Sequence, residues 1–177
     1  MADNQDTETY SEQYIYMFMD AAGRGLPVDA SSVVLTEMQL RHNAFEVEMT
    51  EAAQDLLGEK PPIGDPALVV EIEELVKRIQ AGEVIKCKTT FPAAALGVLW
   101  AWHIVTGFQW QWRAVKKDWW ETLAIADPDN KYVILPVQFM RGVASSQEVE
   151  RWPHEIIDAI NQGRLPDSEA GGLLRIA

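Results

Sequence analysis

The side chains that most often carry chemistry are few and widely separated in this sequence. The three histidines, His42, His103 and His154, stand alone, and none belongs to an HxxxH, HxH or HxxE pattern of the kind that binds a metal. The single cysteine, Cys87, has no second thiol with which to form a disulfide or a thiolate cluster. We therefore predict no metal ligands and no cofactor.

Motifs for phosphate binding and for nucleophilic catalysis are also missing. The chain contains no GxGxxG, no GxxxxGK[ST] and no GxSxG, so we predict no catalytic residues from local patterns. A catalytic site assembled from distant positions leaves no local motif. One alternative therefore stays open, an enzyme with a dispersed site around His103 and nearby acids.

The acidic residues are concentrated in the first half of the chain. Residues 1–83 contain 17 acids and 5 bases, a charge of −12, whereas residues 84–177 contain 10 of each, a charge of zero. An acidic surface repels nucleic-acid phosphate, so we predict no binding to DNA or RNA. The same surface attracts a basic protein and speeds the encounter with it. Solubility alone is the alternative explanation of these acids.

The most plausible partner-binding surface combines these acids with an aromatic anchor. Trp119 and Trp120 follow Lys116-Lys117-Asp118, and consecutive strand residues face opposite ways, so one of the two tryptophans can be exposed. Exposed tryptophan is a common hot-spot residue in interfaces. The predicted partner-binding residues are Glu46, Glu48, Glu51, Asp55, Glu71, Glu74, Trp119 and Trp120.

The sequence favours a cytoplasmic protein that does not enter a membrane. The first residues, MADNQDTETYSEQ, lack the basic and apolar regions of a signal peptide, and a single cysteine fits a reducing compartment. Residues 89–112 contain no acidic or basic side chain and are long enough to span a bilayer. Because this stretch contains Pro92, Gly97 and His103 and alternates in its second part, we interpret it as a buried helix followed by a strand.

Helices are the elements that would position the acids. After a disordered tail (1–8), apolar spacing predicts a helix over 9–22 and a second from Ser31 or Ser32 to Leu57, with a possible break at His42–Asn43. Asp65 and Pro66 are a favourable N-cap and first residue for a third helix, over 66–81. One face of this helix is apolar, through Leu68, Ile72, Leu75, Val76 and Ile79.

The sequence of the second half of the chain predicts a central helix followed by an antiparallel meander. Residues 83–90 are an edge strand or an extended connector, and Phe91–Gly107 is a helix that is apolar on nearly all sides and therefore buried. Three strands follow, over 108–113, 120–126 and 132–140, and one face of the sheet packs on this helix while the other is more polar. The turns are Lys116–Asp118 and Asp127–Asn130. The third strand buries Val133, Leu135, Val137 and Phe139, with Pro136 at an edge or a bulge.

The predicted fold class is α+β, in one domain over 9–165. Its acidic helical half (9–82) forms a layer, and the remainder (83–165) places the central helix on a three- to four-stranded antiparallel meander. A short helical turn from Ser145 or Ser146 to Trp152 and a helix over 153–162 complete it, and residues 166–177 form a flexible tail. The spacing of the tryptophans in 91–140 places most of them inside.

The stretch ALGVLWAWHIVTGFQWQWRAVKKDWWETLAIADPDNKYVILPVQFM, within residues 93–140, resembles a pattern in small uncharacterised bacterial domains. These combine an LG-containing helix, a glycine, a tryptophan-rich strand and a strand that ends in a Pro-Val/Phe-x-Phe-like motif. The matching residues are Leu96, Gly97, Gly107, Trp110, Trp112, Pro136 and Phe139. Such domains are similar to immunity proteins encoded beside toxins in bacterial competition systems.

The resemblance and the acidic charge together lead to one leading hypothesis. It is an immunity protein that binds a cognate toxin with a basic surface and occludes it. A structural scaffold or homo-oligomer, in which the acids serve only solubility, is a further alternative.

Overall fold

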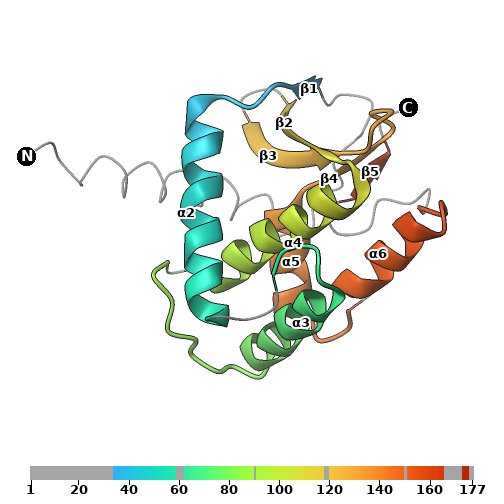
Figure 1. Cartoon of the computed structure of the whole chain (residues 1–177). Coiled ribbons are helices and arrows are strands. Elements are labelled where there is room, and N and C mark those ends of the chain that lie inside the picture. The colour runs from blue at the N-terminus through green and yellow to red at the C-terminus, as the bar shows by residue number, and fades with distance from the viewer. Residues whose placement is uncertain are drawn as a thin grey trace, which may run out of the picture.

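The fold is α+β, with helices packed beneath one end of an antiparallel sheet (Figure 1). The computed structural model describes residues 34–58, 62–89, 91–117, 120–149, 151–165 and 173–175. The predicted tail 1–8, the predicted helix 9–22 and Trp119 lie outside these residues. The α+β class predicted from the sequence is confirmed.

Among the described residues, the sheet has five strands in the order β1-β2-β3-β4-β5, and each strand is antiparallel to its neighbours. A hairpin of β2 and β3 forms its middle, with Trp112 opposite Ile125. The strands are β1 (Val34–Thr36), β2 (Gln111–Lys117), β3 (Trp120–Ala126), β4 (Tyr132–Ile134) and β5 (Leu173–Arg175). The helices are α2 (Leu40–Leu57), α3 (Pro66–Gln80), α4 (Pro92–Phe108), α5 (Pro136–Ser145) and α6 (Pro153–Asn161).

Helix α4 lies at the centre of the hydrophobic core, as the sequence predicts. It packs against α2 on one side and α5 on the other, and Leu96, Trp100 and Ile104 are fully buried. The Trp100 ring stacks on Phe139 of α5 with 4.8 Å between ring centroids. Although long and apolar, α4 does not meet the requirements of a bilayer-spanning helix, and neither does any other helix in the described ranges.

The predicted helix over 66–81 is confirmed as α3, and its first turn shows why it begins there. The Asp65 side chain accepts a hydrogen bond from the Ala67 N–H at 2.9 Å, and Pro66 occupies the first helical position. Leu68, Ile72 and Val76 are buried on the predicted face. The described residues of the predicted connector, 83–89, form neither a strand nor a helix.

Helix α2 begins later than predicted. Residues 34–36 do not continue a helix from Ser31 or Ser32, because they form β1 and pair with residues 114–116 of β2. The expected break at His42–Asn43 is absent, and α2 runs unbroken to Leu57. The buried His42 ring accepts the Gln39 N–H on Nδ1 at 2.9 Å, so it satisfies one of the unpaired backbone donors of the first turn.

The predicted third strand is wrong beyond Ile134. Leu135 ends the extended segment and Pro136 begins α5, so the proline starts a helix instead of interrupting a strand. Val137, Met140 and Val143 are buried at helical spacing, whereas the alternation of Val133, Leu135, Val137 and Phe139 suggested a strand. The two periods coexist in this segment, and proline at the first helical position favours the helix.

The sheet differs from the prediction in three ways. The strand predicted over 108–113 is β2, which begins at Gln111 because α4 extends to Phe108, and Lys116 and Lys117 belong to β2 instead of the turn. The face turned away from α4 is not polar. It holds a second buried apolar cluster, which comprises Val115, Ala124, Ala126, Val133 and Leu135.

The C-terminal part departs from the prediction at two places. Residues 146–149 are not helical, since α5 continues to Ser145 and a bend follows it. Residues 173–175 form β5 on the edge of the sheet, within the segment expected to be a flexible tail. The predicted helix over 153–162 is confirmed as α6, with Ile156 buried.

Candidate functional site

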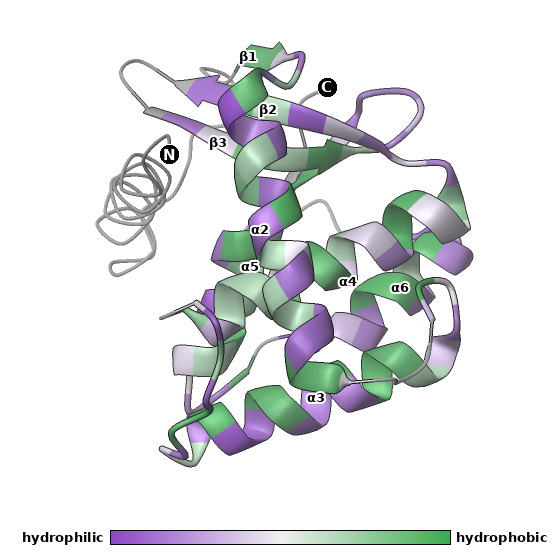
Figure 2. Cartoon of the chain, turned by 60° about the vertical axis from the view of Figure 1, so that its left-hand side comes forward, coloured by the Kyte–Doolittle hydropathy of each residue, from purple (hydrophilic) through white to green (hydrophobic). Residues whose placement is uncertain are grey.

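The outward side of α2 carries a stripe of exposed residues that changes character along the helix. It comprises Leu40, Ala44, Val47, Glu51 and Asp55, at offsets of 4, 7, 11 and 15, which place them on one helix face. Leu40 is 87% exposed and Val47 is 50% exposed, so the first part of this α2 stripe is apolar and the second part is acidic. Figure 2 shows hydrophobic and hydrophilic residues together along this side of α2.

An open pocket lies beside the α2 stripe, between α2, α4 and the loop before α3. Its volume is about 440 Å³, within the range of small ligand sites. Two helices line it through residues one turn apart, since Val47 and Glu51 face it from α2 while Trp102 and Thr106 face it from α4. The remaining lining residues are Glu46, Thr50 and Ile63. We call this cavity the α2–α4 pocket.

The wall of the α2–α4 pocket is held by hydrogen bonds and ring contacts. Glu46 is 8% exposed, and its Oε1 accepts hydrogen bonds from the Trp102 indole Nε1–H and, at 2.8 Å, from the Thr50 hydroxyl. The Trp102 ring also packs edge-to-face on Trp112, with 5.4 Å between centroids. These contacts fix the orientation of the carboxylate and the indole before any ligand arrives.

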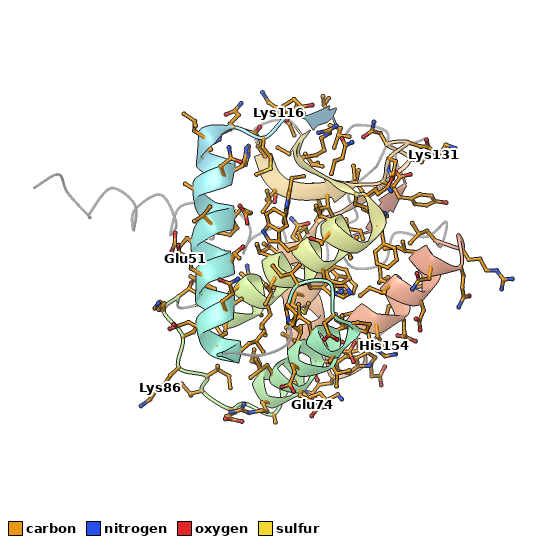
Figure 3. The ribbon with its side chains drawn as sticks, viewed as in Figure 1. Glu51, Glu74, Lys86, Lys116, Lys131 and His154 are labelled. Atoms are coloured by element: carbon orange, nitrogen blue, oxygen red, sulfur yellow. The ribbon has the colours of Figure 1, made fainter. Side chains whose placement is uncertain are left out.

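The lining of the pocket is negatively charged. Among the residues that the structure describes, it includes the carboxylates of Glu46 and Glu51 and no lysine, arginine or histidine. The other surfaces are aromatic and aliphatic, from Trp102, Ile63 and Val47. Figure 3 shows Glu51 at the outer edge of α2. The arrangement suits a ligand that has an apolar body and a positive charge.

The predicted partner-binding residues are only partly brought together. Glu46 and Glu51 line the α2–α4 pocket, whereas Glu48 is half-buried on α2. Asp55, at the end of the α2 stripe, is ion-paired with Lys88 at 3.2 Å. Two predicted acids belong instead to α3: Glu71 is half-buried, and exposed Glu74 pairs with Lys77 at 2.7 Å.

The structure does not test the prediction that Trp119 or Trp120 is an exposed aromatic anchor. Trp119 lies outside the described residues, and for Trp120 the backbone is placed at the start of β3 without a description of its side chain. In the α2–α4 pocket, the aromatic side chain is Trp102, which lies beside exposed Glu51 and buried Glu46. The sequence contains a signal for it, since Trp102 and Thr106 are one helical turn apart on the same side of α4, but the distance to α2 along the chain conceals the pocket.

A second polar cluster joins α2 to the sheet, with His42 and Glu121 buried and Arg41 exposed. Arg41 forms an ion pair with Glu121 of β3, and His42 Nε2 lies 3.9 Å from the other oxygen of Glu121. Burial of the imidazole, and next the charge of Arg41, lowers the pKa of His42 to about 4. The cluster fixes the start of α2 against the hairpin, and therefore the direction of the α2 stripe.

A third polar contact joins α3 to the start of α6. Glu73 Oε1 accepts the His154 backbone N–H and contacts His154 Nδ1, both at 2.8 Å. Figure 3 shows His154 near α3 at the start of α6. A carboxylate at a helix N-terminus is stabilised by the helix dipole, so this contact docks α6.

His103, the centre of the enzyme alternative, is inside the molecule. Its side chain is 5% exposed, and burial lowers its pKa while the Asp65 carboxylate opposes this shift. It does not line the α2–α4 pocket, although its neighbour Trp102 does. Within the described part of the chain, no group of three or more histidine, cysteine or acidic residues has the arrangement of a metal site.

Comparisons with known proteins add no relative to this description. No family model matches the chain, and neither the curated proteins nor the solved structures give a significant match.

Proposed function

We propose that the protein is an inhibitor of the immunity type, which binds a basic toxin through the outward side of α2 and occludes it. The observation that carries the proposal is the α2 stripe, in which exposed Leu40 and Val47 continue into exposed Glu51 and Asp55 beside the α2–α4 pocket. Interfaces combine apolar residues, which become buried, with polar residues around them. The resemblance of residues 93–140 to immunity-type domains adds support.

Charge supports the choice of a basic partner. The chain carries a net charge of −12, and residues 1–83 account for all of it. A field of this sign raises the rate of encounter with a cationic protein and repels nucleic acid. The apolar part of the α2 stripe would then supply the buried contact that keeps the complex together.

The two alternatives have less support in the geometry. An enzyme centred on His103 requires that side chain to reach a substrate, and it is buried outside the pocket. A scaffold that uses the α2 stripe for self-association would bring acidic helices of two copies together, which like charges disfavour. Binding of a cationic protein agrees best with both the apolar and the acidic parts of the stripe.

Binding and rescue experiments with the product of the adjacent gene test this proposal. The full chain is used as bait for that product, and growth is measured when the two are expressed together. We expect a complex, rescue from the toxicity of the product, and an association rate that falls as salt rises. Absence of both a complex and rescue would contradict the proposal.

A matched pair of variants locates the interface. Val47→Lys places a positive charge in the α2 stripe, whereas Val84→Lys places the same charge at a 90% exposed valine in the connector before α4. Val47→Lys should weaken binding by about 10-fold or more, the range of an interface hot spot, and Val84→Lys should leave binding within about twofold. Equal effects of the two variants would exclude α2 as the contact surface.

A further inference from the structure

We propose that the α2–α4 pocket receives a long cationic side chain, a lysine or an arginine, from the partner protein. The inference rests on the proposed function, since it names the group that the same surface would hold. The argument depends on the lining of the pocket, its charge and the fixed position of its aromatic wall.

The apolar part of the lining suits the stem of such a side chain. Ile63, Val47 and the Trp102 ring supply aliphatic and aromatic surface. Two threonine side chains add to this lining, each about one helical turn further along: Thr50 after Val47 in α2, and Thr106 after Trp102 in α4. Lysine and arginine bury their methylene stems against surfaces of this kind while the charged end finds a polar partner. A volume of about 440 Å³ accommodates a single side chain together with water.

The charged part of the lining selects the sign of the ligand. Of the described residues that line the pocket, the ionisable ones are Glu46 and Glu51, and both are acidic. An anion would be repelled, and a neutral apolar side chain would remove water from Glu46 and Glu51 without replacing those hydrogen bonds. An ammonium or guanidinium group replaces them with charge-assisted hydrogen bonds.

The aromatic wall adds a directional contribution. The Trp102 indole donates to Glu46 and packs against Trp112, so its plane is set by the protein. A cation within about 6 Å of an indole face is attracted to it, most strongly for tryptophan among the aromatic residues. Preorganisation of both the carboxylate and the indole lowers the entropy lost on binding.

A direct test uses small probes and the full-length protein. N-acetyl-lysine amide, N-acetyl-arginine amide and the neutral N-acetyl-norleucine amide are titrated while the Trp102 indole signal and the Thr106 methyl signal are followed by NMR. The cationic probes should bind about three- to tenfold more tightly than norleucine amide, as expected for one carboxylate and cation–π site. Comparison of the lysine and arginine probes identifies the preferred cation.

Variants provide the matched control for this titration. Glu51→Gln removes one pocket charge at an exposed position, and Glu148→Gln removes the same charge at an exposed residue outside the pocket. Glu51→Gln should abolish most of the preference for the cationic probes, while Glu148→Gln should preserve it. Equal binding of norleucine amide and lysine amide, or equal effects of the two variants, would overturn the inference.

Failure of this inference can be distinguished from failure of the proposed function. If the adjacent gene product does not bind but the cationic probes do, the pocket assignment stands and the immunity function is wrong. If that product binds wild type and Glu51→Gln equally well, the function stands and the pocket assignment is wrong. A third outcome concerns residues 1–33. If the probes shift the NMR signals of a variant that lacks these residues but not those of the full chain, residues 1–33 occupy the pocket, and the inference is overturned.

Discussion

At the residue scale, the buried imidazole of His42 connects the local structure of α2 to the behaviour of the protein in acid. The ring is fully buried, it accepts the Gln39 N–H on Nδ1, and Arg41 lies beside it. A proton on Nδ1 would remove that acceptor and place two donors face to face. The neutral ring is thus part of the helix start, and its protonation works against the folded state.

The stability of the protein should therefore decrease in mild acid because of His42. The folded-state pKa, about 4, lies below the ordinary value of 6.5, so the unfolded chain binds a proton more readily between these two values. The contribution of His42 is complete above about pH 6.5 and declines as the pH falls toward 4, by up to roughly 3 kcal/mol. Urea unfolding at several pH values measures this decline.

His42→Gln supplies the control for this prediction. Glutamine at the third helical position can accept the N–H of the N-cap residue, yet it does not titrate. The variant should show a flatter dependence of the unfolding free energy on pH between 6.5 and 4. Parallel curves for wild type and variant would mean that His42 is not the group responsible.

At the scale of elements, the packing of α4 on α5 depends on one glycine. A Cβ atom at Gly97 would lie 2.5 Å from the carbonyl oxygen of Pro136 and 3.0 Å from Cβ of Met140. The first of these contacts is with backbone, which a rotamer change cannot relieve. The two helices approach this closely because position 97 has no side chain.

Gly97→Ala should consequently separate α4 from α5 and reduce stability. We expect a loss of about 1–3 kcal/mol, the range for overpacked cores. For a chain of this size, thermal unfolding should shift downward by roughly 2–4 °C for each kcal/mol. Gly142→Ala in α5 is the matched control, since a Cβ there meets nothing within 4 Å, and we expect it to be neutral or stabilising by up to about 1 kcal/mol. Similar losses in both variants would refute the packing explanation.

Element prediction from the sequence succeeded where one signal dominated and failed where two competed. Asp65 and Pro66 mark the start of α3 through their own chemistry, so the prediction was accurate to within a residue. Around Pro136 the apolar residues fit both a strand and a helix, and the contact with α4 decides between them. β1 was hidden for a related reason, because its pairing partner in β2 is remote in sequence.

The candidate site was predicted less well than the fold. Glu46 and Glu51 were expected to bind a partner because they are acidic and helical; both line the pocket, and their binding of a partner stays a prediction. Trp102 belongs to the predicted central helix, and a helix that is apolar on nearly all sides gives no indication of which residue reaches a cavity. The residues of α2 and α4 that line the pocket are far apart in the sequence and come together only through tertiary packing. Hydrophobic periodicity does not predict such packing.

At the scale of the whole molecule, the charge determines how copies of the protein interact with one another. The net charge is −12 on 177 residues, and residues 1–83 account for all of it. Two copies of this charge repel each other, and α2 itself carries more acids than bases, so self-association through α2 is unfavourable. A basic partner meets no such barrier.

The isolated protein should therefore be a monomer. Size-exclusion chromatography with light scattering at low salt should give a mass near 19.9 kDa. Screening of the charge by salt should leave this value unchanged if no apolar surface drives dimerisation. A mass twice as large that persists at low salt would favour the scaffold alternative over the inhibitor.

The pairing of β1 with residues 114–116 has a consequence for folding during synthesis on the ribosome. Val34 is opposite Lys116, so β1 cannot pair until about 80 further residues have been synthesised. The apolar side of α2 likewise cannot be buried until α4, on which it packs, has been synthesised. Contacts of such high sequence separation form slowly, and they cannot form before their second member has been synthesised. The described part of the acidic half, residues 34–58 and 62–82, is thus not a separable folding unit. The outward side of α2 acquires a fixed shape only after most of the protein has been synthesised.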